Sequence, residues 1–263
     1  MMSIIVVTLK GIFRDRVFQG IMLPAVLFLL IPSAASLSMR QVLELSTTLS
    51  LSLISFLLLL LSVFLGATSL WKDMERRYTY SVLSLPINRS SYLFGRFLGL
   101  ALFLLLTSAV LGAAACLVVK AAAGLSPPDR PVVWSWLVLS ILFTTLKYIL
   151  LLAVAFLLSA VSTSFFLPVF GTICIFLAGG VTQQVYEYLN SPSAAAMPSY
   201  VKPLFTAVYY FLPNFAGFDL KVNAIYRIAP NPGGLWLTAA YFLAYTALVM
   251  GAASVLFNRR EMK

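Results

Sequence analysis

The residues of this chain that could do chemistry are few, and many of them lie between residues 72 and 96, which read KDMERRYTYSVLSLPINRSSYLFGR. Beyond that stretch, Lys147 lies alone in a long apolar run, and Gln183 and Gln184 lie near the end of another. Side chains of these types offer charge and hydrogen bonds to a partner or to a passing solute.

Residue types that support catalysis or metal binding are scarce. The chain has no histidine, and its two cysteines, Cys116 and Cys174, lie inside apolar stretches where a thiol behaves as a small hydrophobe. We see no cluster of His, Asp or Glu near one membrane face. The sequence therefore predicts no catalytic residue, no metal site and no disulfide framework.

The elements that position these residues must lie in lipid. Of the 263 residues, 61% are hydrophobic and 10% charged, and the mean hydropathy is +0.98, which excludes an ordinary water-soluble globular domain. A net charge of +10 would suggest nucleic acid in a soluble protein, but here most basic residues act as topology signals. We expect the bilayer as a partner and no nucleic acid.

Six apolar segments are long enough to span a bilayer, and lipid favours helices because it offers backbone groups no hydrogen-bond partner. We predict an all-α integral membrane protein whose residues 1–263 form one transmembrane domain. The N-terminus resembles a signal peptide, but we expect its apolar run to be retained as the first span. Pro24 and Pro168 are expected to kink the first and fifth spans. The predicted spans are 17–38, 48–70, 93–119, 133–160, 165–186 and 234–257.

The distribution of basic residues predicts the orientation. Six spans put both termini on one side, and that side carries eleven basic residues against six on the other. The positive-inside rule then places both termini in the cytoplasm. The eleven are Lys10, Arg14, Arg16, Lys72, Arg76, Arg77, Arg89, Arg96, Arg259, Arg260 and Lys263.

Two further helices are expected outside the spans. Ile5, Leu9 and Ile12 share a helical face, so the first residues form an interfacial helix or, alternatively, a frayed terminus. The long outer segment 187–233 has apolar residues at helical spacing after Pro203, which predicts a short amphipathic helix that Pro213 ends. That helix rests on the outer leaflet or packs against neighbouring loops.

The segment 72–96 is the only sizeable cytoplasmic loop in this topology. Its charged start and apolar side predict a short helix that Pro86 stops, after which Asn88 or Ser90 caps a new helix leading into the third span. Such an element can dock on a soluble partner and transmit movement to two spans. The alternative is a basic loop that only fixes topology.

The same segment resembles the coupling region of type-2 ABC exporter permeases, the ABC-2 family. The resemblance rests on an acidic residue, a Leu-rich stretch, a Pro, an Arg three residues later and a final Gly-Arg, although Arg77 and Tyr78 replace the usual Gly-Thr. The whole architecture looks most like permeases labelled as involved in multicopper-enzyme maturation, such as those of nitrous oxide reductase assembly. The residues expected to couple to an ATPase are Asp73, Glu75, Arg76, Arg77, Pro86, Arg89, Gly95 and Arg96.

The resemblance implies partners and a cofactor held elsewhere. It implies a homodimer or a dimer of related permeases, with two ABC ATPase subunits on the cytoplasmic face of a bacterial inner membrane. The chain has no Gly-x-x-x-x-Gly-Lys-[Ser/Thr] loop, so it holds no cofactor itself, and ATP and Mg are expected in the partner ATPase. The chain is then not an enzyme by itself.

Three residues are candidates for a substrate path. Lys147 lies half way through the fourth span, where a charge costs at least ~2.5 kcal/mol on insertion scales. It either contacts an anionic group in transit or is a packing lysine satisfied by nearby hydroxyls and carbonyls. Gln183 and Gln184 either line an exit or are ordinary interfacial residues.

Two other function classes stay open at this stage. One is an integral membrane enzyme acting on lipid-linked substrates, which the lack of clustered His, Asp or Glu disfavours. The other is a stand-alone secondary transporter, which the lack of intramembrane carboxylates and of repeat symmetry disfavours.

Overall fold

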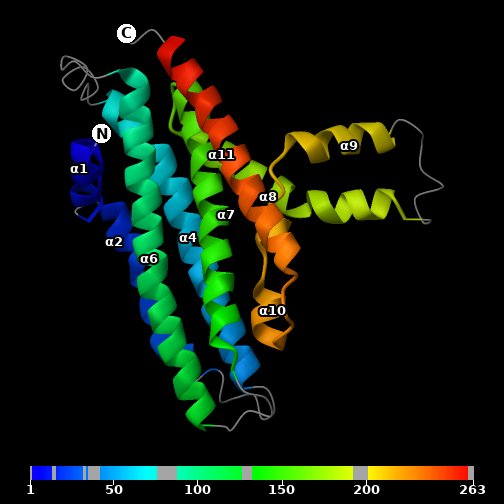
Figure 1. The fold of residues 1–263 in the computed structure, drawn as a ribbon. Helices are drawn as coiled ribbons and strands as arrows, with labels where there is room; N and C mark the ends of the chain where they lie inside the picture. Colours follow the sequence, from blue (N-terminus) through cyan, green and yellow to red (C-terminus); the bar gives the residue numbers. More distant parts are fainter. Residues whose placement is uncertain are drawn as a thin grey trace.

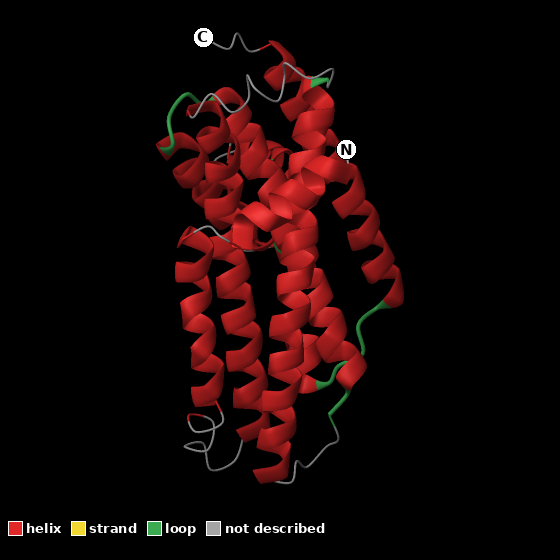
Figure 2. Cartoon of the chain, turned by 90° about the vertical axis from the view of Figure 1, so that its left-hand side faces the viewer, coloured by secondary structure: helices red, strands yellow, loops and turns green. Residues whose placement is uncertain are grey.

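The computed structural model describes residues 2–13, 16–31, 34, 42–75, 88–125, 132–191 and 201–259. Helices make up nearly all of these residues (Figure 2). In chain order they are α1 (Met2–Phe13), α2 (Arg16–Met22), the 3₁₀ helix η1 (Leu23–Leu30), α4 (Val42–Glu75), α6 (Arg89–Leu125), α7 (Trp134–Val161), α8 (Phe166–Leu189), α9 (Val201–Phe211), the 3₁₀ helix η3 (Ala216–Phe218), α10 (Lys221–Tyr226) and α11 (Pro232–Arg259).

Within the described residues, five helices are long and apolar enough to cross a membrane: α4, α6, α7, α8 and α11. They overlap the last five predicted spans, and α4 and α6 run several residues past the predicted ends. The extra length arises because the flanking residues, such as those at 89–92 and 120–125, continue the helix without a Gly-Pro or Pro-Pro break.

The first predicted span, 17–38, is built differently. The α-helix α2 ends at Met22, and a 3₁₀ helix begins at Leu23 with Pro24 as its second residue. Proline has no N–H to donate to an α-helical hydrogen bond, which explains why the α-helix stops next to Pro24, where a kink was expected. Residues 32, 33 and 35–38 of this span lie outside the described residues, so the six-span count remains a prediction.

The helices form an elongated bundle with α7 near its centre (Figure 1). α7 is the most buried of the five long helices and packs against α4, α6, α8 and α11. The hydroxyls of Ser55 on α4 and Tyr148 on α7 are 2.6 Å apart in a buried hydrogen bond. An interhelical hydrogen bond of this kind holds two helices together where the hydrophobic effect cannot.

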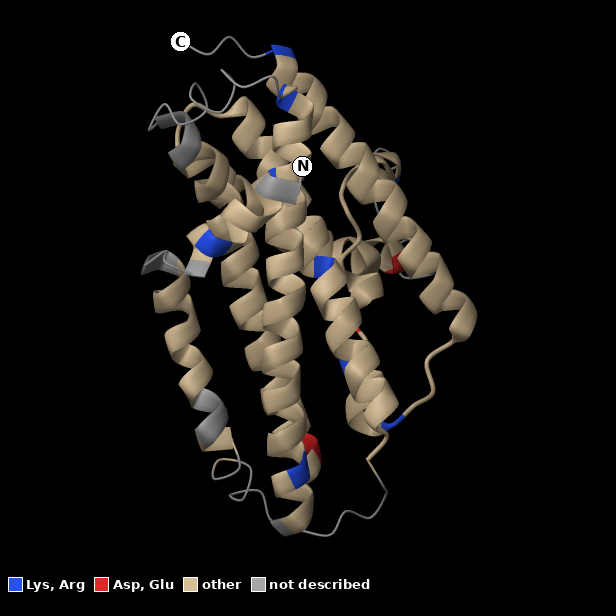
Figure 3. Ribbon diagram, turned by 60° about the vertical axis from the view of Figure 1, so that its left-hand side comes forward, with Lys and Arg blue, Asp and Glu red and all other residues tan. Residues whose placement is uncertain are grey.

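The two ends of the bundle differ in what they carry. The N- and C-terminal ends of the chain lie toward the same end, together with the end of α4 and the start of α6 (Figure 1). Figure 3 shows Lys and Arg residues near both ends of the bundle and at a few places between them, while most of each long helix is uncharged. This arrangement is typical of helices whose middle parts lie in hydrocarbon.

α8 does not run parallel to the bundle. It leaves the side of the bundle, and α9 lies alongside it, so that the pair projects outward (Figure 1). Pro168 lies in the first turn of α8, where its missing N–H costs no helical hydrogen bond, rather than at a kink within the helix. The helix expected after Pro203 is present as α9, and it ends at Phe211, two residues before Pro213.

After α9 the chain returns to the bundle. Phe215 and Phe218 are buried, and η3 and α10 pack against α7. The final helix then begins at Pro232, and the side-chain oxygen of Asn231 accepts the backbone N–H of Gly233 at 3.0 Å, as an N-cap does. The part of this segment from Phe215 to Tyr226 therefore packs on the bundle, whereas α9, which has no buried residue, lies along α8.

Candidate functional site

The predicted coupling residues lie on either side of the loop between α4 and α6. Asp73 and Glu75 belong to the last turn of α4, so residues 72–75 prolong that helix instead of starting a separate one. Arg76, Arg77 and Pro86 lie outside the described residues. The loop therefore joins the ends of two long helices.

The expected helix after Asn88 is present. α6 begins at Arg89, the residue after Asn88, and the backbone carbonyl of Asn88 accepts the N–H of Tyr92 at 3.1 Å. The helix continues through Gly95 and Arg96 into the third predicted span. The exit of the loop is thus the first turn of a helix of 37 residues.

The first turn of α6 is bonded to the last turns of α11. Arg89 Nη1 donates to the backbone carbonyl of Asn258 at 3.4 Å, and Asn258 Nδ2 donates to Ser90 Oγ at 2.8 Å. Ser254 Oγ donates to the same Ser90 Oγ at 3.0 Å. A cation near the C-terminal end of a helix also interacts favourably with the partial negative charge there.

A second contact joins α6 to the N-terminal helix. Gly95 and Gly99 face α1, and a methyl group on Gly99 would lie 2.9 Å from Thr8 Cβ. Arg96 Nη1 donates to Thr8 Oγ1 at 3.2 Å, and Thr8 is itself buried. The absent side chains of these two glycines therefore let α1 lie directly on α6.

Lys147 lies inside the bundle, 6% exposed. Its ammonium is 5.0 Å from the centroid of the Tyr148 ring, which is within cation–π range. Asp219 and Lys221 lie in the segment that returns to the bundle after α9. The Asp219 carboxylate attracts the Lys147 ammonium, and the Lys221 ammonium repels it. Lys147 is therefore enclosed by protein, with one carboxylate in electrostatic reach.

Gln183 and Gln184 have different surroundings. Gln183 Oε1 accepts hydrogen bonds from Tyr209 Oη at 3.0 Å and from Asn214 Nδ2 at 2.9 Å. Gln183 Nε2 donates to Glu187 Oε1 at 2.6 Å. Gln184 is exposed on another face of α8. Gln183 thus ties α8 to α9 and to the returning segment.

These residues form three separate places in the fold rather than one site. Of the predicted coupling residues, Arg89 contacts α11 and Gly95 and Arg96 contact α1. Lys147 lies at mid-bundle, and Gln183 is bonded to α9. Sequence reasoning did not single out Thr8 and Asn214, because nothing local to them signals that α6 and α8 lie close by. Across the described part of the chain, no three His, Cys, Asp or Glu side chains come together as metal ligands would.

Comparison with models of known protein families gives a match over most of the chain. Residues 9–262 match the model of a family described as "ABC-2 family transporter protein". No curated protein matches the chain. The family match covers nearly every element described above, from α1 to the end of α11.

Proposed function

The chain belongs to the ABC-2 transporter family, and on that basis we propose that it is the membrane-spanning permease subunit of an ABC exporter. Members of this family work in general with ABC ATPase subunits. The match over residues 9–262 is the observation that carries the proposal. In this assignment ATP and Mg are bound by the partner, and the chain itself catalyses no reaction.

The proposed docking surface for the ATPase is the loop between α4 and α6 with its flanking turns. Its residues are Asp73, Glu75, Arg76, Arg77, Pro86, Arg89, Gly95 and Arg96. The support is mechanical: the exit of the loop is bonded to α11 through Asn258 and packed under α1 through Gly99. A push on the loop would therefore move three helices together rather than one.

The finer assignments follow the same proposal. α2 and η1, with the residues that follow them, would form the first of six spans, and the termini would lie in the cytoplasm of a bacterial cell. This is supported by the position of the N- and C-terminal ends at one end of the bundle (Figure 1). Two copies, or this chain and a related permease, would pair with two ATPase subunits.

The substrate path would pass Lys147, with Gln183 and Gln184 nearer its outer end. Lys147 is a buried cation within a candidate span, a position where charged residues commonly mark a substrate or ion path, and this supports a contact with an anionic group in transit. The resemblance to permeases of multicopper-enzyme maturation remains part of the proposal and names no substrate.

The proposal is tested by co-purification with the ABC ATPase encoded nearest to this chain, followed by mass measurement of the complex in mild detergent. A complex with two copies of each subunit is the expected result. Glu75→Lys and Arg89→Glu should each abolish ATPase association while membrane insertion is kept.

The matched control is Lys120→Glu, which reverses a charge near the opposite end of α6. It should leave ATPase association intact. Unimpaired association of both coupling variants would overturn the assignment of the docking surface, and a chain that purifies without any ATPase would overturn the permease assignment.

A further inference from the structure

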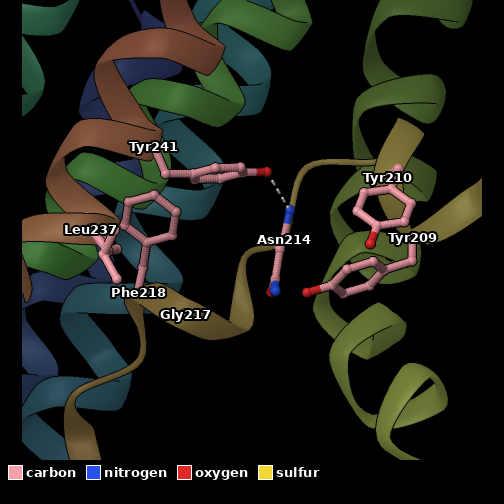
Figure 4. Close-up of a pocket in the computed structure, with 8 residues that line it drawn as sticks. Tyr209, Tyr210, Asn214, Gly217, Phe218, Leu237 and Tyr241 are labelled. Carbon is pink, nitrogen blue, oxygen red and sulfur yellow. Dashed lines mark hydrogen bonds between the residues drawn. The ribbon is translucent and has the colours of Figure 1, made fainter. Parts of the chain in front are cut away.

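A pocket of about 320 Å³ lies between α9, the turn at 214–218 and α11. Four aromatic rings line it, those of Tyr209, Tyr210, Phe218 and Tyr241, and they stand around Asn214 (Figure 4). Phe218 is fully buried at its base. The pocket is thus a built feature of the returning segment and not a gap between loops.

Hydrogen bonds among the lining residues and to their neighbours hold the walls of the pocket in place. The Tyr241 hydroxyl accepts the backbone N–H of Asn214 at 2.9 Å, as the dashed line in Figure 4 marks. The Asn214 side chain donates one N–H to Gln183, and its oxygen accepts the backbone N–H of Ala216 at 3.0 Å. The aromatic rings are therefore positioned before any ligand arrives.

Two hydrogen-bond donors remain for a ligand. The Tyr241 hydroxyl accepts a bond from Asn214 and still has its own O–H to donate, and the Asn214 amide has a second N–H. Neither has another acceptor among the described residues. Each of these donors suits a neutral acceptor such as a carbonyl oxygen.

The pocket carries no formal charge. None of its lining residues is acidic or basic. The tyrosines are neutral phenols at pH 7, and the electrostatic influence of Tyr186 raises the pKa of Tyr210 further. A charged group would gain no ionic partner inside, so the enclosed part of a ligand is neutral.

The rim of the pocket continues into an apolar surface. Leu237, which lines the pocket, is 74% exposed, and its neighbour Trp236 is 78% exposed. Both belong to the first turns of α11, a helix long and apolar enough to span a membrane. The pocket therefore opens beside an apolar surface at the start of a candidate membrane span.

We propose that this pocket binds a neutral glycerolipid, with an acyl chain against the aromatic rings and one ester carbonyl accepting a hydrogen bond from the Tyr241 hydroxyl. Aromatic walls favour the apolar chain, and the Tyr241 donor selects the ester over a bare hydrocarbon. The inference goes beyond the permease assignment, because binding requires neither ATP nor the ATPase partner. If the lipid does not bind, the permease assignment still holds, and if no ATPase associates, the lipid-binding proposal still holds.

The test uses the purified full-length chain in phosphatidylcholine nanodiscs, with a diacylglycerol that carries a diazirine in one acyl chain as the probe. After illumination, the labelled peptides are identified by mass spectrometry. Labelling is expected at residues 209–218 and 237–241, and excess unlabelled dioleoylglycerol should remove it. Tyr241→Phe lacks the O–H donor and should bind about fivefold more weakly.

A second variant fills the pocket without disturbing its walls. A Cβ on Gly217 would meet no atom within 4 Å, so Gly217→Leu places its side chain in open space within the pocket and should lose the labelling. The matched control is Gly180→Leu on α8, where a Cβ also meets nothing within 4 Å, and it should keep the labelling.

Contact with bulk lipid alone is the outcome that would overturn the proposal. In that case labelling would spread evenly over exposed apolar residues such as Leu177 and Val181, unlabelled dioleoylglycerol would not compete, and Gly217→Leu would change nothing. Thermal denaturation of each variant in the same nanodiscs shows whether it is folded.

Discussion

Arg89, the first residue of α6, donates a hydrogen bond across 169 residues of sequence to the backbone carbonyl of Asn258, near the end of α11. The same Asn258 returns a bond from its side chain to Ser90. The loop that we propose as the ATPase docking surface therefore ends where the first turn of α6 is bonded to the last turns of α11, the second and the last of the five long helices.

The Asn258 side chain is expected to transmit loop movement to α11. Asn258→Ala removes the bond to Ser90 and should lower the free energy of unfolding by no more than about 1 kcal/mol, because the site is exposed. ATPase stimulation in the assembled complex should fall much further. The control is Asn190→Ala, whose amide bonds only within its own helix. Equal effects of both variants on ATPase stimulation would contradict the role of Asn258.

Contact between α1 and α6 can be tested by a cross-link. A Cβ on Gly95 would lie 3.3 Å from Ile4 Cβ, close to the separation in a disulfide. In a chain whose own Cys116 and Cys174 are replaced by Ala, the pair Ile4→Cys and Gly95→Cys should form a disulfide under mild oxidation. Val7→Cys with Gly95→Cys should not, because Val7 is 61% exposed and faces away. Adding Gly99→Leu, which displaces Thr8, should prevent the first cross-link.

Two adjacent glycines on α8 should respond in opposite directions. A Cβ on Gly179 would collide with the backbone oxygen of Pro213 and lie 2.8 Å from the Phe215 ring, whereas a Cβ on Gly180 meets nothing within 4 Å. Gly179→Ala should destabilise the protein by about 1–3 kcal/mol, since overpacking must push the returning chain away. Gly180→Ala should be neutral or stabilise by up to ~1 kcal/mol through helix propensity. Unfolding in mixed micelles measures both, and equal values would contradict the close approach.

Replacement of Lys147 separates its two interpretations. Lys147→Met keeps the side-chain length and removes a buried charge, so the folded chain should lose no stability. If Lys147 contacts an anionic group in transit, transport by the assembled complex should fall sharply while basal ATP hydrolysis persists. A loss of more than about 1 kcal/mol in unfolding free energy would instead assign Lys147 to helix packing.

The long helices could be predicted from the sequence because each contains an apolar run that lipid forces into a helix. The first span could be foreseen only as a segment of spanning length. Its change to a 3₁₀ helix at Leu23 depends on how Pro24 is accommodated against α4 and α6, which pack on η1. Local spacing contains no information on that packing.

The polar contacts were beyond sequence reasoning for a different reason. Gln183 and Gln184 are equivalent as residue types, yet successive side chains on a helix point about 100° apart, so only one of them can face α9. Tyr209 reaches Gln183 because α9 packs on α8, and Asn214 follows directly after α9. The bonded residues are 26 and 31 positions apart in the sequence, so local spacing does not predict these contacts.

The length of α6 has a mechanical consequence. Its 37 residues rise about 55 Å, whereas the hydrocarbon core of a bilayer is about 30 Å thick. The helix must therefore tilt or protrude. In the proposed permease, a rod of this length packed against α4 and α7 would carry a displacement of its Arg89 end along the helix toward its Leu125 end, so the two membrane faces would need no separate signal.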